Sequence, residues 1–300
     1  MAAQFTTVNL SQLPVPNLIQ QISFDDIVAA QLADLVARDP TYTATVESDP
    51  AYKILEVTAY RETLVRQAAN NYAMGLMLAF AEGPQLDQLG ANVNVGRLTL
   101  TPADNTTVPP TPAVMEEDDD YRARIQLSFE GYTTAGSQGS YEYHAFSADA
   151  RVADCWATSP SPGVVNVYVL SNVGDGTATP DLLAAVNAAL SAEDVRPLTD
   201  QVNVLSAEIV DYEIDAVLTV YPGPDPDVIL AAAQTGAQTY VNSVRKLGYT
   251  VSAAGIDGSM FVAGVADIAR SNPSATLSLQ PQQAGYCTAI NITVNQQASD

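Results

Sequence analysis

Apolar residues recur at helical spacing near the start of the chain. Ser23 precedes this run as a helix N-cap, and Asp25 and Asp26 place negative charge in the first turn, where the helix dipole favours it. The pattern predicts a helix that ends at Asp39-Pro40. Its apolar positions are Phe24, Ile27, Val28, Leu32, Leu35 and Val36.

A second start signal follows at Asp49-Pro50, with Asp as N-cap and Pro at the first helical position. Neither proline nor glycine then occurs until Gly75, and the next stop signal is Gly83-Pro84. The pattern predicts one helix of about 33 residues, close to 50 Å long at about 1.5 Å per residue.

This long helix carries an apolar stripe, with alanines that allow close helix packing. Two interpretations stay open: part of the stripe contacts another chain, or the helix forms an antiparallel hairpin with the first helix, which could cover about half of its length. We predict a helix-bundle surface for partner binding, made of Ile54, Leu55, Leu64, Val65, Ala68, Tyr72, Leu76 and Phe80; Ala69 and Ala73 complete the stripe.

Turn-forming residues dominate after Gly90, with Pro102, Pro109, Pro110 and Pro112 in an extended crossing segment. The acidic run from Glu116 to Asp120 lacks the alternating spacing and central glycine of a calcium-binding EF-hand loop. It precedes the helix "YRARIQLSFEG", for which Gly131 is the predicted C′ residue. Carboxylates at a helix N-terminus therefore explain the run without a metal.

The stretch "EGYTTAGSQGSYEYHAFS" is rich in glycine and hydroxyl groups and holds His144, the only histidine. It is not a P-loop, because the lysine is missing and a helix precedes it. It also lacks the GxSxG pattern of a nucleophile elbow. We interpret it as a helix–turn–helix joint in which Ser140 starts the second helix, with no catalytic triad and no multi-histidine metal site.

From Ala150 onward, strands and helices alternate. "RVADCWATS" and "GVVNVYVLS" are predicted strands, a helix follows Thr179-Pro180, and residues 200–223 form a strand pattern with one buried face. A long helix after Asp225-Pro226, a short helix and two strands complete the chain. In residues 200–223, Tyr212, Ile214, Ala216, Leu218 and Val220 alternate with Glu213, Asp215 and Thr219.

The predicted fold class is therefore multidomain α+β: an N-terminal long-helix region followed by two small α/β (α+β) units in series. The predicted segments are residues 1–92 (helical region and bundle), 93–149 (crossing segment and helix–turn–helix joint), 150–206 (first small α+β domain) and 207–300 (second small α+β domain).

Composition narrows the function. The chain has 34 acidic and 12 basic residues, a net charge of −22, so nucleic acid and anionic membranes are poor partners. Cys155 and Cys287 are far apart and form no zinc pattern, which favours free thiols. No secretory signal or membrane-spanning run is visible, so we expect a soluble product of the cytoplasm. No catalytic, cofactor-binding or metal motif is found.

Several motifs together resemble one family, the baseplate J-like proteins, which are wedge proteins of contractile phage tails. They are "LSQLPVPNLI", "AYRETLVRQAANN", "LDQLGANVNVGRL", "YRARIQLSFEGYTTAGSQGSYEYHAFSADARVADCWATSPSPG", "AEDVRPLTDQVNV" and "YEIDAVLTVYPGPD". They follow one another in unbroken order over nearly the whole chain. The Tyr-Glu-Tyr-His pattern around His144 implies a structural helix in that family.

The resemblance implies an assembly role and no enzyme activity. Two copies would join one tail-protein-I-like partner as a wedge through a bundle of N-terminal helices. A small lysozyme-like wedge protein would link that bundle to the sheath, and neighbouring wedges would close a ring around the hub. The expected location is the virion tail baseplate, after synthesis and assembly in the host cytoplasm.

Three alternatives differ from a phage baseplate wedge. The first is the equivalent wedge subunit of a phage-derived injection particle, such as a tailocin or secretion machine, which gene neighbourhood would distinguish. The second is a carboxylate-pair glycosidase, but no pair of carboxylates stands out in an apolar context that would raise a pKa. The third is a solitary ligand-binding module, against which the lack of an exposed aromatic cluster argues.

Overall fold

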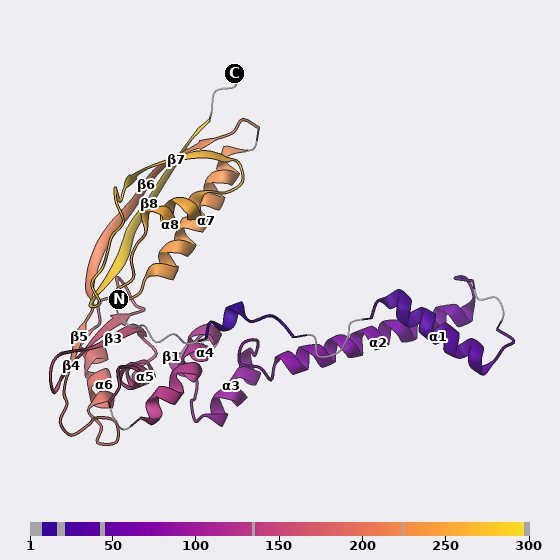
Figure 1. Ribbon diagram of the computed structural model, residues 1–300, viewed down its shortest axis with the longest axis horizontal. Helices are drawn as coiled ribbons and strands as arrows, with labels where there is room; N and C mark the ends of the chain where they lie inside the picture. The colour runs from indigo at the N-terminus through magenta and orange to yellow at the C-terminus, as the bar shows by residue number, and fades with distance from the viewer. Residues whose placement is uncertain (1–7, 17–21, 43–45, 134–135, 224, 297–300) are drawn as a thin grey trace. The chain divides into compact units, whose positions relative to one another are not determined.

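The computed structural model describes residues 8–16, 22–42, 46–133, 136–223 and 225–296 (Figure 1). Its contacts divide the chain into two compact units. The helical unit comprises the described residues up to Arg97 together with Glu117–Ile125, and the sheet unit comprises Leu98–Glu116 and the described residues from Gln126 onward. The four segments predicted from the sequence stay a prediction beside this division.

The helical unit begins with the 3₁₀ helix η1 (Leu10–Gln12) and a hairpin of two helices, α1 (Phe24–Arg38) and α2 (Pro50–Met74). Both predicted starts are confirmed. The Ser23 side chain accepts a hydrogen bond from the Asp26 backbone N–H, and Asp49 accepts one from Ala51. These caps satisfy backbone donors that a first turn leaves free.

The predicted single helix of about 33 residues is wrong, because α2 has 25 residues and ends at Met74. Gly75 is its C-cap, and tighter turns continue to Ala81. Gly83-Pro84 does not stop a helix but starts α3 (Gly83–Asn92). The side chain of the preceding Glu82 makes no cap, and the Gly83 N–H instead donates to Asp118 Oδ2 at 2.9 Å.

Helix α4 (Asp118–Leu127) packs on the turns around α3. The Tyr121 hydroxyl, buried in this contact, donates to the Val95 carbonyl at 2.7 Å. The Arg122 guanidinium donates to the Leu78 and Ala81 carbonyls, each at 2.8 Å. Side chains of α4 therefore satisfy the carbonyls that the irregular turn after α2 leaves without helical partners.

The sheet unit resumes at Gln126, near the end of α4, and continues with the 3₁₀ helix η2 (Ser128–Tyr132) and with α5 (Gln138–Ala148). Gly131 therefore lies within η2 and is not a C′ residue, which corrects that prediction. The cap of α5 is Ser137, whose side chain accepts from the Ser140 N–H, so this helix starts before the predicted Ser140. The turn between the helices includes residues 134 and 135, which lie outside the described residues.

The central sheet of this unit pairs β3 (Val152–Ser161), β4 (Val164–Ser171) and β5 (Gln201–Ser206) in that order. β3 is antiparallel to β4, and β5 is parallel to it because α6 (Pro180–Leu190) provides the crossover. The strand valines pack against α5 and α6 in one buried cluster. A short pair, β1 (Thr99–Thr101) and β2 (Val114–Met115), lies in the crossing segment.

The C-terminal sheet has β6 (Glu208–Val220) between β7 (Val265–Asn272) and β8 (Gln283–Gln296). Helices α7 (Pro226–Val244) and α8 (Ala253–Met260) cover one face (Figure 1). The predicted alternation is confirmed, since Tyr212, Ile214, Ala216, Leu218 and Val220 are all buried in this core. The mixed helices and small sheets in series confirm the predicted α+β class.

Residues 200–223 do not form one strand, because Ala207 separates β5 from β6 and the two belong to different sheets. Within the described ranges, no helix combines the length and the apolar character needed to cross a membrane.

Candidate partner-binding surface

Helix α2 presents one face to α1. Ala59 is fully buried there with Ile27 and Val28 of α1. Polar contacts extend the hairpin, since the Thr58 hydroxyl donates to Gln31 Oε1 at 2.6 Å and Gln31 Nε2 donates to Glu62 Oε2 at 3.2 Å. The hairpin interpretation of the sequence is therefore right for this face.

The opposite face of α2 is apolar and exposed. Val65 is 68 % and Tyr72 is 71 % exposed, although both would gain from burial. We call this set the α2 outer face: Ile54, Val57, Tyr60, Leu64, Val65, Ala68 and Tyr72. Steps of three and four residues place them along one side of the helix, away from Ala59. A helix with apolar residues on two opposite sides is typical of one that is buried on both sides.

The predicted partner-binding residues divide into two groups. Ile54, Leu64, Val65, Ala68 and Tyr72 lie together on the α2 outer face. The other three do not: Leu55 is one turn from buried Ala59 and so lies toward the α1 side, while Leu76 and Phe80 come after the helix has ended. Leu76 is nevertheless exposed. That α2 binds a partner through these residues stays a prediction.

The sequence reading missed Val57 and Tyr60, which are also exposed on this face. The signal was present in the spacing, because Val57 lies three residues after Ile54 and Tyr60 lies three residues after Val57. Arg61 interrupts the apolar pattern between Val57 and Val65. A helical projection of 50–74 would have grouped both residues with Ile54 and Val65.

The acidic run is engaged in contacts of its own chain. Asp118 accepts from the Gly83 N–H and pairs with Arg97 at 2.6 Å, and hydrogen bonding to Gly83 is the main cause that lowers its pKa. Asp119 pairs with Arg122 of the same helix. Across the part of the chain that the structure describes, no group of three or more His, Cys, Asp or Glu side chains is placed to hold a metal ion.

His144 lies on α5, half-buried against its neighbours. Its ring meets Tyr143 edge-on with 5.2 Å between ring centroids. Burial lowers its pKa, while a hydrogen bond to the Gly131 backbone and the charge of Asp194 act in the opposite direction. The ring of Tyr143 occupies the space beside Gly131 where a side chain would otherwise lie. These contacts join α5 to η2 and assign His144 a packing role.

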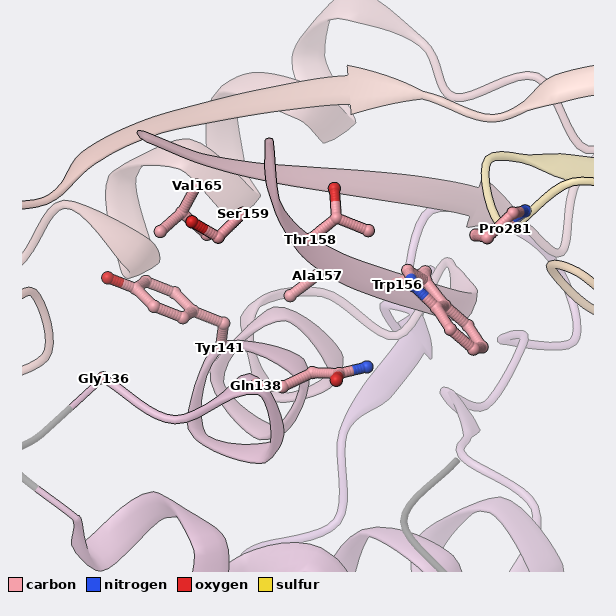
Figure 2. Close-up of a pocket in the computed structure, with 9 residues that line it drawn as sticks. All are labelled: Gly136, Gln138, Tyr141, Trp156, Ala157, Thr158, Ser159, Val165 and Pro281. Carbon is pink, nitrogen blue, oxygen red and sulfur yellow. The ribbon is translucent and has the colours of Figure 1, made fainter. Parts of the chain in front are cut away.

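A cavity of about 390 Å³ opens beside α5 and β3 (Figure 2). It is lined by Gly136, Gln138, Tyr141, Trp156, Ala157, Thr158, Ser159, Val165 and Pro281. None of these side chains is charged at neutral pH. The hydroxyl of Tyr141 donates to Asp200 Oδ2 at 2.7 Å, and burial raises its pKa far above neutrality. The cavity therefore lacks an acid–base pair among its lining residues.

Two carboxylates do sit where burial raises their pKa, contrary to the expectation that none would stand out. They are Glu142 on α5 and Asp154 on β3, and burial is the main cause for both. Each is used by its own chain: Glu142 accepts from Gln138 at 2.8 Å, and Asp154 accepts from two backbone N–H groups. Neither lines the cavity, so they do not form a glycosidase pair there.

The described residues thus offer an exposed apolar helix face, a half-buried histidine packed between α5 and η2, and a cavity with an uncharged lining. Comparison with known proteins gives the class. The model of the baseplate J-like N-terminal domain matches residues 47–104, and the model of the baseplate J-like central domain matches residues 133–206. With the relative described next, these matches show that the chain belongs to the baseplate J-like family.

The relative is baseplate protein J of Escherichia phage P2. It is 46 % identical over 292 residues, which cover 95 % of this chain and 97 % of that protein. Among solved structures, a chain of the anti-feeding prophage baseplate is 11 % identical with a TM-score of 0.32. The match covers 88 % of this chain and 53 % of that one, about half its length.

Proposed function

We propose that this protein is a structural subunit of the baseplate of a contractile phage tail. Its membership of the baseplate J-like family and its 46 % sequence identity to a phage baseplate protein support this role. The observation that carries the proposal is the α2 outer face, which α1 leaves uncovered over most of the helix length. The proposed action is mechanical, by contact between chains, with no catalytic step.

In this proposal the protein forms a wedge. The α2 outer face joins a bundle with a second copy of the chain and a tail-protein-I-like partner. A small lysozyme-like wedge protein then links the bundle to the sheath, and the sheet unit contacts neighbouring wedges around the hub. The apolar character of α2 supports the first contact, because burial of each large apolar side chain contributes roughly 1.5–3 kcal/mol.

A matched pair of valines tests the contact. Val65 on α2 and Val228 on α7 are 68 % and 67 % exposed, so Asp at either position alters the isolated chain little. Val65→Asp places a charge in the proposed bundle and is expected to lower the yield of assembled wedges about tenfold or more. Val228→Asp is expected to assemble as the unchanged protein does.

Wedge assembly is measured by co-expression with the neighbouring tail proteins, followed by size-exclusion chromatography and mass photometry. Circular dichroism on each variant confirms that the fold is retained. Normal assembly of the Val65→Asp variant, with its fold intact, would show that the α2 outer face is not part of the wedge contact. An equal loss in both variants would point to a general effect of added charge.

A further inference from the structure

Strand β8 forms one edge of the C-terminal sheet. It has 14 residues, and β6 is its only strand neighbour among the described residues. At the start of β8, the Gly248 N–H donates to the Gln283 carbonyl at 2.8 Å, so the segment after α7 covers the outer side there. From Gly285 to Gln296, the backbone of no described residue pairs with that outer side. Unpaired N–H and C=O groups along an edge are a template for a strand of another chain.

The two edges of this sheet differ in their protection against such pairing. β7 has 8 residues and carries Asp267 and Arg270, and charged side chains on an edge strand oppose pairing with another chain. β8 has neither a charged residue nor a proline. Thr288 has no partner in the register with β6, which marks a bulge, but Ala289–Gln296 then runs beside β6 without a further shift. This last segment is therefore a regular and unprotected edge.

The charge of the chain bears on what can cover this edge. Two copies with a net charge of −22 each repel one another over most of their surfaces. The β8 edge lets them approach without charged side chains of the strand facing each other, whereas a partner recognised by its own charge would find no opposite charge on this strand. A strand can also pair with an identical strand in antiparallel direction about a two-fold axis, because both present the same alternation of donors and acceptors.

We propose that β8 is a docking edge for a second copy of this chain, whose own β8 pairs with it in antiparallel direction. The two three-stranded sheets then form one continuous sheet. This proposal rests on the proposed wedge role for the presence of neighbouring copies, and it assigns a surface to the contact that the sheet unit makes. The α2 outer face lies in the other unit, so the two contacts can be tested separately.

The side chains of β8 favour one register, with the two-fold axis at Ile292. This register places Ile290 opposite Val294 of the second copy. Both residues pack against the core under α7 and α8, so the apolar row of each sheet continues into the other. On the other face, the exposed Asn291 lies opposite the exposed Thr293. Apolar residues therefore meet apolar residues, and polar residues meet polar ones.

Sedimentation velocity of the full chain tests the contact, with Val65→Asp in every sample so that α2 does not contribute. Thr293 on β8 and Ala269 on β7 are both exposed and both lie beside Val217 of β6, on opposite sides of it. Thr293→Asp brings two like charges close to the axis and is expected to raise the dissociation constant of the dimer about tenfold or more. Ala269→Asp is the matched control and should leave this constant unchanged.

Disulfide cross-linking tests the register and remains decisive if Thr293→Asp folds poorly. A mixture of the Asn291→Cys and Thr293→Cys chains is expected to form more disulfide-linked dimer than either variant alone, because directly opposite residues have Cβ atoms about 4.5–5.5 Å apart. The unchanged chain measures the background from Cys287, which is partly buried.

Three results would each overturn the proposal. They are a chain that stays monomeric at every concentration, an equal effect of the Asp substitutions on β8 and β7, and no excess of cross-linked dimer in the mixture. The first would mean that a different protein, or water alone, covers this edge. None of them alters the wedge yield of the Val65→Asp variant, so a failure here is distinguishable from a failure of the proposed function.

Discussion

Single residues in the sheet unit titrate unusually because they are buried, and the direction depends on the charge of the group. Burial raises the pKa of Asp154 and lowers that of His144, since both shifts favour the neutral form. The consequences for stability are opposite. Asp154 stabilises the sheet unit more as the pH falls, whereas His144 stabilises it less, because the unfolded chain then takes up the proton more readily.

His144→Gln tests the packing role of the histidine. Glutamine can hydrogen-bond but cannot titrate, so we expect near-normal particle infectivity and a loss of stability below about 1 kcal/mol at pH 7.5. The histidine component of stability is present above its unfolded pKa, near 6.5, and is lost below it. The variant should therefore lose less stability between pH 7.5 and pH 5 than the unchanged protein, as measured by denaturant unfolding.

A functional defect of the His144→Gln variant would contradict the packing role of this residue. Loss of a specific enzymatic step by His144→Gln, while particles still assemble, would contradict the reading of this residue as structural.

At the scale of helices and strands, the features predicted correctly from the sequence are those that depend on residues close together in the chain. The caps at Ser23, Asp49 and Asp225 are confirmed because each side chain bonds a backbone group two or three residues away. The alternation along β6 is confirmed because it depends only on which side of the sheet is covered. The α2 outer face was found in part, since helical spacing is also a local property.

The wrong predictions concern helix and strand boundaries that are determined by residues distant in the sequence. Gly83-Pro84 reads as a stop, but it starts α3 because Asp118, 35 residues later, takes the place of a side-chain cap. Residues 200–223 read as one strand, but they form two strands in different sheets, because β5 pairs with β4 whereas β6 pairs with β8 and β7. The partly buried carboxyl group of Asp154 was missed for the same reason, since its hydrogen-bond partner Leu247 lies 93 residues away in the sequence.

The contact of α3 with α4 offers a sharp stability test. A methyl group at Gly90 would clash with the Tyr121 hydroxyl and come within 2.7 Å of the Val95 carbonyl, and the hydrogen bond between those two groups leaves neither free to move. Gly90→Ala should therefore destabilise the helical unit by about 1–3 kcal/mol despite the better helix propensity of alanine.

Gly96→Ala is the matched control, because nothing lies within 4 Å of the added methyl group. It should change the free energy of unfolding by less than about 0.5 kcal/mol. Thermal unfolding, followed by far-ultraviolet circular dichroism, compares the stability of the two variants. Equal stability of both would mean that α3 and α4 do not pack through Tyr121.

At the scale of the whole molecule, the proposed wedge places two copies of one chain beside a single different partner. Their surroundings then cannot be equivalent, and exact two-fold symmetry is excluded. The chain must adapt at segments that bury little apolar surface. The two predicted hinge segments are the crossing from Thr99 to Val114 and the turn from Thr133 to Gly139. In the second segment, residues 134 and 135 lie outside the described residues, and the last two residues belong to α5.

We therefore expect the two copies in an assembled particle to superpose part by part but not as whole chains. Rotation should occur within those two segments, while Ala150 to Leu205 stays rigid. Comparison of both copies in a particle reconstruction measures this. Whole-chain identity between the copies, or a hinge within Ala150 to Leu205, would exclude the predicted adaptation.

The central claim is that α2 works between chains, and cryo-electron microscopy of purified particles tests it most directly. A reconstruction that traces side chains shows what lies against Val65 and Tyr72, which are more than half exposed in the single chain. The account predicts that helices of a second copy and of a different tail protein cover the α2 outer face. A reconstruction in which this face borders solvent would contradict it.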